Sequence, residues 1–168
     1  ESATGRFVGP RRDLMTDPEH VSEHGRVSGR ELFGSFLFFF GVALWWMHPL
    51  PQVMGDHLPN HGATEPLVFT DLQLIVWALA WGSRALVTQP AEIFDANIFY
   101  PMPESLAFSE HFFGLLPLFA PVYWATDNPI LAANTTILAI FVLRALAMQI
   151  LLRRYAGSEA AILGALFF

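Results

Sequence analysis

Two ionisable residues, Glu110 and Arg144, lie within otherwise apolar stretches and are the first candidates for chemistry. A charged side chain inside a membrane is costly and normally has a partner of opposite charge. Glu110 precedes Trp124 by fourteen residues and Arg144 follows Ile130 by fourteen, so an antiparallel helical hairpin would place both about 21 Å from its turn. We therefore expect a structural intramembrane pair. The alternatives are that one of the two faces a polar cavity or substrate, or that it reaches a lipid headgroup.

His111 follows Glu110 but points about 100° away from it around a helix. Several phenylalanines lie near it in the sequence, and a neutral imidazole in an apolar wall can be an axial ligand of a haem or a chlorophyll-type pigment. The commoner role is that of a hydrogen-bonded residue near a helix end. We keep His111 as the candidate residue for a pigment or haem contact and expect no intrinsic cofactor.

A metal site is the third kind of chemistry to consider. His57 and His61 are four residues apart, and Asp56 precedes them, a spacing that could place two imidazoles on one helical face. Pro59 lies between the histidines and argues against a helix there. The chain has no cysteine, and it contains no GxGxxG, Walker, GxSxG, HExxH or CxxC motif. We therefore expect no metal site.

The composition indicates the surroundings in which these residues must work. Hydrophobic residues make up 54% of the 168 residues and charged residues 14%, with sixteen Phe and five Trp. A soluble domain of this size could not hide so many apolar side chains. All nine basic residues are Arg, the net charge is -6, and the sequence holds no basic patch, which argues against nucleic-acid binding. The sequence predicts an all-α integral membrane protein.

Three apolar runs are candidate transmembrane helices: residues 32–50, 106–124 and 130–152. Residues 1–31 form a polar tail, and Trp45 and Trp46 are placed as interfacial anchors near the end of the first run. The second and third runs form a hairpin in which Asp127 or Asn128 caps the following helix. Residues 153–168 look like the start of a further apolar segment.

The loop 51–105 holds one more apolar stretch, a helix predicted over residues 71–88. Its uncharged core is too short to span comfortably, and Gln73 and Arg84 fall on the same side of a helical wheel. We expect an amphipathic helix in the membrane interface, with Trp77 and Trp81 at headgroup level. The alternative is a spanning helix, which would place every Arg cluster on the cytoplasmic side.

A resemblance to a known family lies in four segments: DLQLIVWALAWGSRAL, FDANIFYP, SLAFSEHFFG and TDNPILAAN. The first of these segments begins at Asp71. From there to the C-terminus the chain resembles the N-terminal part of large bacterial GT-C-type glycosyltransferase-like membrane proteins. The resemblance implies the bacterial inner membrane, a cytoplasmic N-terminus and a large outer loop with interfacial helices. It also implies a catalytic carboxylate in that loop, for which Asp56, then Asp71, then Asp95 is the best match, acting on a polyprenyl-phosphate-linked sugar.

The family's members have many more membrane helices, which build the donor site, so we expect this chain to be inactive alone. We favour a non-catalytic accessory subunit at the periphery of a larger membrane complex, such as a photosynthetic reaction-centre and antenna assembly. Other membrane protein subunits and lipid would then cover aromatic surfaces such as Phe36 to Phe40, with a chlorophyll-type pigment or carotenoid as further contacts. The alternative is the N-terminal fragment of a glycosyltransferase of that family.

Overall fold

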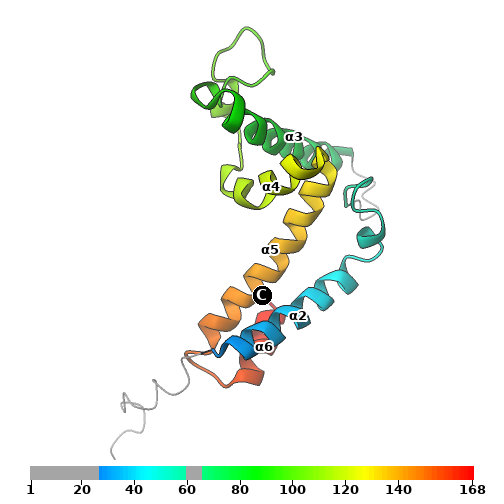
Figure 1. Cartoon of the computed structure of the whole chain (residues 1–168), viewed down its shortest axis with the longest axis vertical. Coiled ribbons are helices and arrows are strands. Elements are labelled where there is room, and N and C mark those ends of the chain that lie inside the picture. Colours follow the sequence, from blue (N-terminus) through cyan, green and yellow to red (C-terminus); the bar gives the residue numbers. More distant parts are fainter. Residues whose placement is uncertain (1–26, 60–65) are drawn as a thin grey trace, which may run out of the picture.

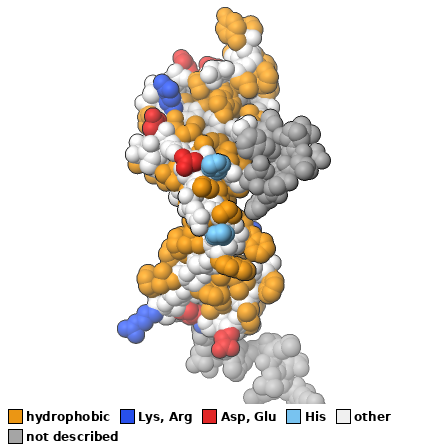
Figure 2. Space-filling model, turned by 90° about the vertical axis from the view of Figure 1, so that its right-hand side faces the viewer, with side chains coloured by type: hydrophobic (Ala, Val, Ile, Leu, Met, Phe, Trp, Pro, Cys, Tyr) orange, Lys and Arg blue, Asp and Glu red, His pale blue; other side chains and the backbone are white. Residues whose placement is uncertain are grey.

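The computed structural model describes residues 27–59 and 66–168, and within them every regular element is a helix. The all-α part of the predicted fold class is therefore confirmed. The helices form two regions joined by one long helix, and Figure 2 shows a narrower waist between the regions. The α-helices are α2 (Gly29–Trp46), α3 (Pro66–Thr88), α4 (Leu116–Thr126), α5 (Pro129–Leu152) and α6 (Ser158–Leu166).

The first region, which we call the bundle, consists of α2, α6 and the C-terminal half of α5 (Figure 1). Helix α2 runs antiparallel to α5, because its first turn contacts the end of α5 and its later turns contact the middle. Phe39 and Ala43 of α2 pack against Val142 and Ala145 of α5, and Ala165 of α6 completes this core.

A polar cluster closes the end of the bundle where α2 begins. The Glu31 carboxylate accepts a hydrogen bond from Ser158 Oγ at 2.6 Å, and it forms a salt bridge with Arg153 Nε at 2.9 Å. The Ser158 hydrogen bond and the Arg153 guanidinium hold the pKa of Glu31, which precedes the apolar stretch, below its ordinary value. Ser28 caps α2 by accepting the Glu31 amide. This cluster ties together the start of α2, the end of α5 and the start of α6.

The second region, which we call the outer layer, consists of α3, α4, the segment 89–115 and the start of α5. In Figure 1, α3 lies across the end of α5 rather than along it, with α4 beside both. The core of the outer layer combines Val76 and Leu79 of α3, Leu116 and Phe119 of α4, and the small residues Ala132 and Ala133 of α5. Phe119 is completely buried there.

The predicted membrane helix over 106–124 is wrong. Helix α4 begins only at Leu116, and the residues before it form 3-10 turns at Ser105–Phe108 and Phe113–Leu115. Pro117 has no amide hydrogen and lies in the first turn of α4, where no helical hydrogen bond is lost; a helix continuing upstream would lose one there, as α4 already does at Pro121. Phe112 has a left-handed backbone with φ of 53°, which also breaks the helix. At 11 residues, α4 is about 16 Å long and too short to span a bilayer alone.

Among the described residues, one helix is both long enough and apolar enough to cross a membrane, and that helix is α5. Three predicted spans are thus not confirmed. Helix α2 ends at Trp46 instead of residue 50, and it carries Arg30 and Glu31 in its first turn. The predicted turn before α5 is confirmed, because Asn128 accepts the Leu131 amide at 2.9 Å and Pro129 occupies the first turn.

Helix α3 is longer than the predicted helix over 71–88. It starts at Pro66 and ends at Thr88, as expected from Pro90 just beyond. Its 23 residues measure about 34 Å, but Asp71 and Arg84 still bound a short uncharged core, and α3 is not apolar enough to count as a candidate span. It also lies across the end of α5 rather than along it (Figure 1).

Candidate functional site

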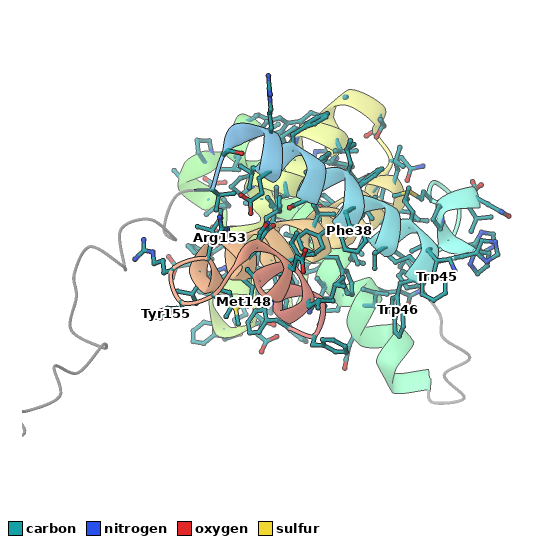
Figure 3. All side chains as sticks on the ribbon, turned by 90° about the horizontal axis from the view of Figure 1, so that it is seen from below. Phe38, Trp45, Trp46, Met148, Arg153 and Tyr155 are labelled. Carbon is teal, nitrogen blue, oxygen red and sulfur yellow. The ribbon has the colours of Figure 1, made fainter. Side chains whose placement is uncertain are left out.

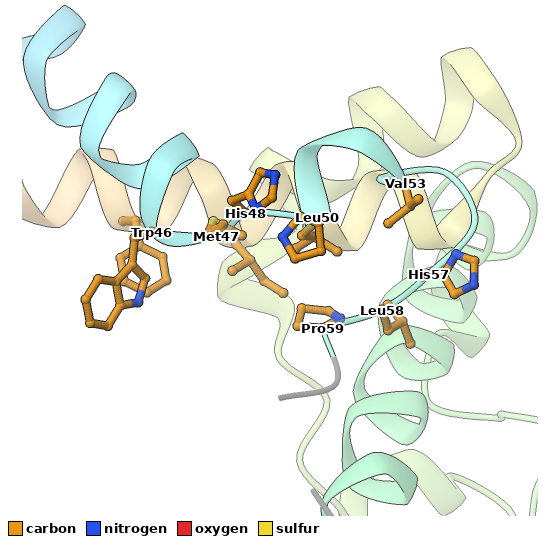
Figure 4. Close-up of a pocket in the computed structure, with 11 residues that line it drawn as sticks. Trp46, Met47, His48, Leu50, Val53, His57, Leu58 and Pro59 are labelled. Carbon is orange, nitrogen blue, oxygen red and sulfur yellow. The ribbon is translucent and has the colours of Figure 1, made fainter. Parts of the chain in front are cut away.

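A cavity of about 300 Å³ lies where α2 ends, between the bundle and the outer layer (Figure 4). Its walls come from the last turn of α2, the chain that follows it, and the middle of α5. Most of the lining is apolar, with two histidines as the titratable groups. The lining residues are Trp46, Met47, His48, Pro49, Leu50, Val53, His57, Leu58, Pro59, Ile137 and Phe141.

Two asparagines of the α5 region hold the chain segment that forms one wall of this cavity. Asn134 is fully buried, and its Nδ2 donates to the carbonyl oxygens of Met54 and His57, both at 2.7 Å. Asn128 Nδ2 donates to the carbonyl of Gly55 at 2.9 Å. These bonds satisfy backbone oxygens that would otherwise be costly to bury. The wall is therefore a built structure fixed to α5.

The cavity has no arrangement suited to metal binding. Figure 4 shows the rings of His48 and His57 well apart, with Val53 between them. Neither residues 27–59 nor residues 66–168 contain three His, Asp or Glu side chains grouped for a metal ion. His61, the third residue weighed for such a site, lies outside the described residues. Chemically, the cavity suits an apolar occupant.

A second cavity, of about 230 Å³, adjoins the first along the bundle and shares Trp46 and Phe141 with it. Arg144 lines this second cavity, which we call the Arg144 groove. The Arg144 guanidinium carbon lies 4.4 Å from the centroid of the Phe141 ring, a cation–π arrangement. The other lining residues are Phe39, Val42, Ala43, Ala145, Ala165 and Leu166.

The structure does not bring Glu110 and Arg144 together. Both side chains are exposed, and the ion pair formed within the described residues joins Glu31 and Arg153 instead. The expected pairing depended on a continuous helix through residue 110, and Glu110 in fact lies in the irregular segment before α4. Arg144 is thus left in the bundle while Glu110 belongs to the outer layer.

His111 lies in an aromatic cluster of the outer layer rather than on a membrane helix. Its ring is 4.3 Å from the Phe113 ring and 5.7 Å from the Phe94 ring, between centroids. Its Nδ1 accepts the Phe113 amide at 3.4 Å. In a neutral imidazole that accepts at Nδ1, Nε2 carries the hydrogen and has no lone pair for a metal. This geometry weighs against axial ligation of a pigment or haem through Nε2.

The three candidate carboxylates are exposed but not grouped. Asp56 lies in the segment held by Asn134, and Asp71 lies in α3. Asp95 follows the other end of α3, and its carboxylate accepts the Glu104 amide. That bond closes the segment 94–106, together with a bond from the Leu106 amide to the Phe94 carbonyl at 3.0 Å. Asp95 therefore acts as a structural clamp.

The four tryptophans chosen as interfacial anchors divide into two pairs. Trp45 and Trp46 are 75% and 67% exposed at the end of α2, and Figure 3 shows them far along α2 from Arg153 and Tyr155. Trp77 and Trp81 are half-buried against the segment 94–106. Trp81 Nε1 donates to the Ile93 carbonyl at 2.9 Å, so this ring serves internal packing.

Sequence reasoning missed the buried amides of α5. Gln149 is fully buried and donates to Ser35 Oγ at 2.8 Å, and Asn134 holds the wall of the first cavity. A signal was present, since both are polar residues inside an otherwise apolar helix. Their partners, separated by 77 residues or more, could not be read from the sequence.

No protein-family model matches this chain, and neither a curated protein nor a solved structure matches it.

Proposed function

We propose that this chain is a membrane subunit whose role is to pack against other membrane protein subunits and lipid. The observation that carries the proposal is the uncovered aromatic surface of α2. Only Ser35, Phe39 and Ala43 of this helix are buried, whereas Phe33 is 63% exposed and Phe38 46%. An apolar surface of this kind needs lipid or protein to cover it.

The placement of arginines supports an orientation for this subunit. Arg30, Arg153 and Arg154 all belong to the end of the bundle where α2 starts and α5 stops. The proposal takes α2 to cross the membrane packed beside α5, although α5 is the one described helix apolar enough to qualify as a span by itself, and takes α4 as too short to cross. This end of the bundle then faces the cytoplasm of a bacterial inner membrane by the positive-inside rule. The outer layer then lies on the opposite side, with α3 along the membrane surface.

The test is extraction from native membranes in mild detergent, followed by intact-mass measurement of the chain and its complex. We expect a large stable complex, from which Phe38→Gln releases the chain while membrane insertion persists. Phe108→Gln is the matched control, because Phe108 is an exposed aromatic residue of the outer layer. A stable lone monomer would overturn the proposal. The absorbance of the complex tests for a chlorophyll-type pigment or a carotenoid.

One observation favours a second candidate, the N-terminal part of a GT-C-type glycosyltransferase. Helix α3 lies across the end of α5 (Figure 1), which suits the interfacial helix of an outer loop. Asp71 lies in this helix, and Asp56 lies in the segment bonded to the start of α5 through Gly55. For this candidate, Asp71→Asn or Asp56→Asn abolishes sugar transfer in the complete enzyme while insertion persists. Asp127→Asn is the control, because Asn also tolerates the left-handed backbone of that position. Unchanged transfer in both variants would exclude these carboxylates.

A further inference from the structure

Arg144 is a charged residue of α5 without a carboxylate partner among the described residues. Its side chain is exposed at the Arg144 groove and lies over the Phe141 ring. A guanidinium in a membrane-spanning helix is costly unless something polar meets it, so an unpaired one marks a place where a partner is expected. The groove beside it supplies apolar walls, including Trp46 and Leu166.

The depth of Arg144 restricts what that partner is. Arg144 precedes Arg153 by nine residues and follows Pro129 by fifteen, so it lies about 13 Å and about 22 Å from the two ends of α5. The guanidinium leans toward Phe141, one turn earlier, and so points away from the nearer end. In a hydrocarbon layer about 30 Å thick, this is near the middle. Lipid phosphates lie at the layer's edges, and the guanidinium points away from the nearer edge, which favours a partner at its own depth.

A second copy of this chain does not supply the missing anion from its membrane helices. Helix α5 contains no Asp or Glu, and α2 contains only Glu31, which lies at its end and already binds Arg153 and Ser158. Helix α6 contains only Glu159, in its first turn and so at the same end of the bundle rather than at mid-depth. The anion at mid-depth therefore comes from a different helix.

The groove presents an apolar surface around this charge. Its rim holds Trp46 and Leu166, which are exposed, and Phe141, which is half-buried, whereas its floor is formed by buried core residues of the bundle. An apolar rim around one cation suits a membrane helix that carries one anion. We propose, building on the packing role above, that the Arg144 groove binds a transmembrane helix of a partner subunit, and that a carboxylate on this helix pairs with Arg144.

The experiment uses the purified chain in phosphatidylcholine vesicles and two synthetic transmembrane peptides that differ only in a central Glu or Gln. Energy transfer between a dye on the chain and one on the peptide reports binding. We expect the Glu peptide to bind at least about tenfold more tightly than the Gln peptide. Arg144→Gln and Arg144→Leu abolish this preference, whereas Arg154→Gln, which removes an exposed charge at the end of the bundle, keeps it.

Thermal unfolding in detergent checks that the variants fold. If Arg144→Leu does not fold, Arg144→Gln alone provides the test of the peptide preference. Equal binding of the two peptides to the wild-type chain would overturn the inference. In a second vesicle preparation that also contains phosphatidylglycerol, binding of this lipid that depends on Arg144, without any peptide preference, would overturn it too, because the occupant would then be an anionic lipid. A native complex that is lost in Phe38→Gln but unchanged in Arg144→Gln would refute this inference and leave the packing role standing.

Discussion

The bundle and the outer layer differ in what their helices leave uncovered. In the outer layer, Phe119 is completely buried, and the side-chain N–H groups of Trp81 and Asn134 donate to backbone carbonyls of neighbouring segments. In the bundle, aromatic side chains of α2 face outward, and the buried polar groups Ser35 and Gln149 bind each other. Figure 2 shows hydrophobic side chains over both regions, with charged side chains at the free end of the bundle and at several places on the outer layer. The outer layer also exposes aromatic side chains, such as Tyr100 and Phe108, but these lie in the irregular segment 89–115. In the bundle, aromatic side chains are exposed along one regular helix, α2, so this helix presents the surface that needs lipid or protein to cover it.

The largest expected effect comes from removing one buried ring in each region. Phe119→Ala leaves a cavity in the outer layer and should lower the free energy of unfolding by about 3–5 kcal/mol. Phe39→Ala, at a site that is 3% exposed in the bundle, should cost about half as much, because lipid or detergent tails are as apolar as the core. Unfolding of both variants in the same detergent measures this. Phe108→Ala is the exposed control, and equal losses for Phe119 and Phe39 would contradict the comparison.

The next effect concerns Asn134, which binds the outer layer to the segment that follows α2. Asn134→Leu leaves the carbonyls of Met54 and His57 without donors, and we expect a loss of about 3 kcal/mol. Amide hydrogen exchange in residues 53–57 should accelerate as well. Asn97→Leu, at an exposed asparagine of the same layer, provides the control. Unchanged exchange in Asn134→Leu would show that these bonds do not hold the segment.

A smaller effect is expected for the amide of the bundle. Gln149→Leu removes one partner of a buried pair and should cost about 1 kcal/mol. The double variant Ser35→Ala/Gln149→Leu removes both partners and should recover most of this loss, because no buried polar group is then left alone. A double-mutant cycle on the free energy of unfolding measures the coupling. If the double variant lost as much free energy of unfolding as Asn134→Leu, the expected difference between the two regions would be contradicted.

The smallest effect belongs to the polar end of the bundle. Glu31→Gln should cost less than about 1 kcal/mol, as partly exposed ion pairs do. Because the folded pKa of Glu31 is lowered, its contribution is present above the ordinary pKa and is lost as pH falls through the folded pKa. Thermal unfolding between neutral and acidic pH should show this slope for the wild-type chain and a weaker one for Glu31→Gln. Glu159→Gln, at an exposed carboxylate of α6, is the matched control.

Local sequence signals were sufficient where a single residue ends or starts a helix. Pro90 predicts the end of α3, and Asn128 followed by Pro129 predicts the start of α5. They failed at 106–124, where apolar composition was given more weight than Pro117, and the expected pairing of Glu110 with Arg144 failed with it. The hydrogen bonds of Asn134 to Met54 and His57 join segments 77 to 80 residues apart, and no local pattern indicates such a contact.

Helix α5 is the one described element that belongs to both regions, and this makes it a lever. Its 24 residues form a rod about 36 Å long, with the bundle around one half and the outer layer attached to the other. A tilt of about 20°, ordinary for a membrane helix, would move the far end sideways by about 12 Å. A partner that changes how α5 stands in the membrane would thereby swing the entire outer layer over the membrane surface.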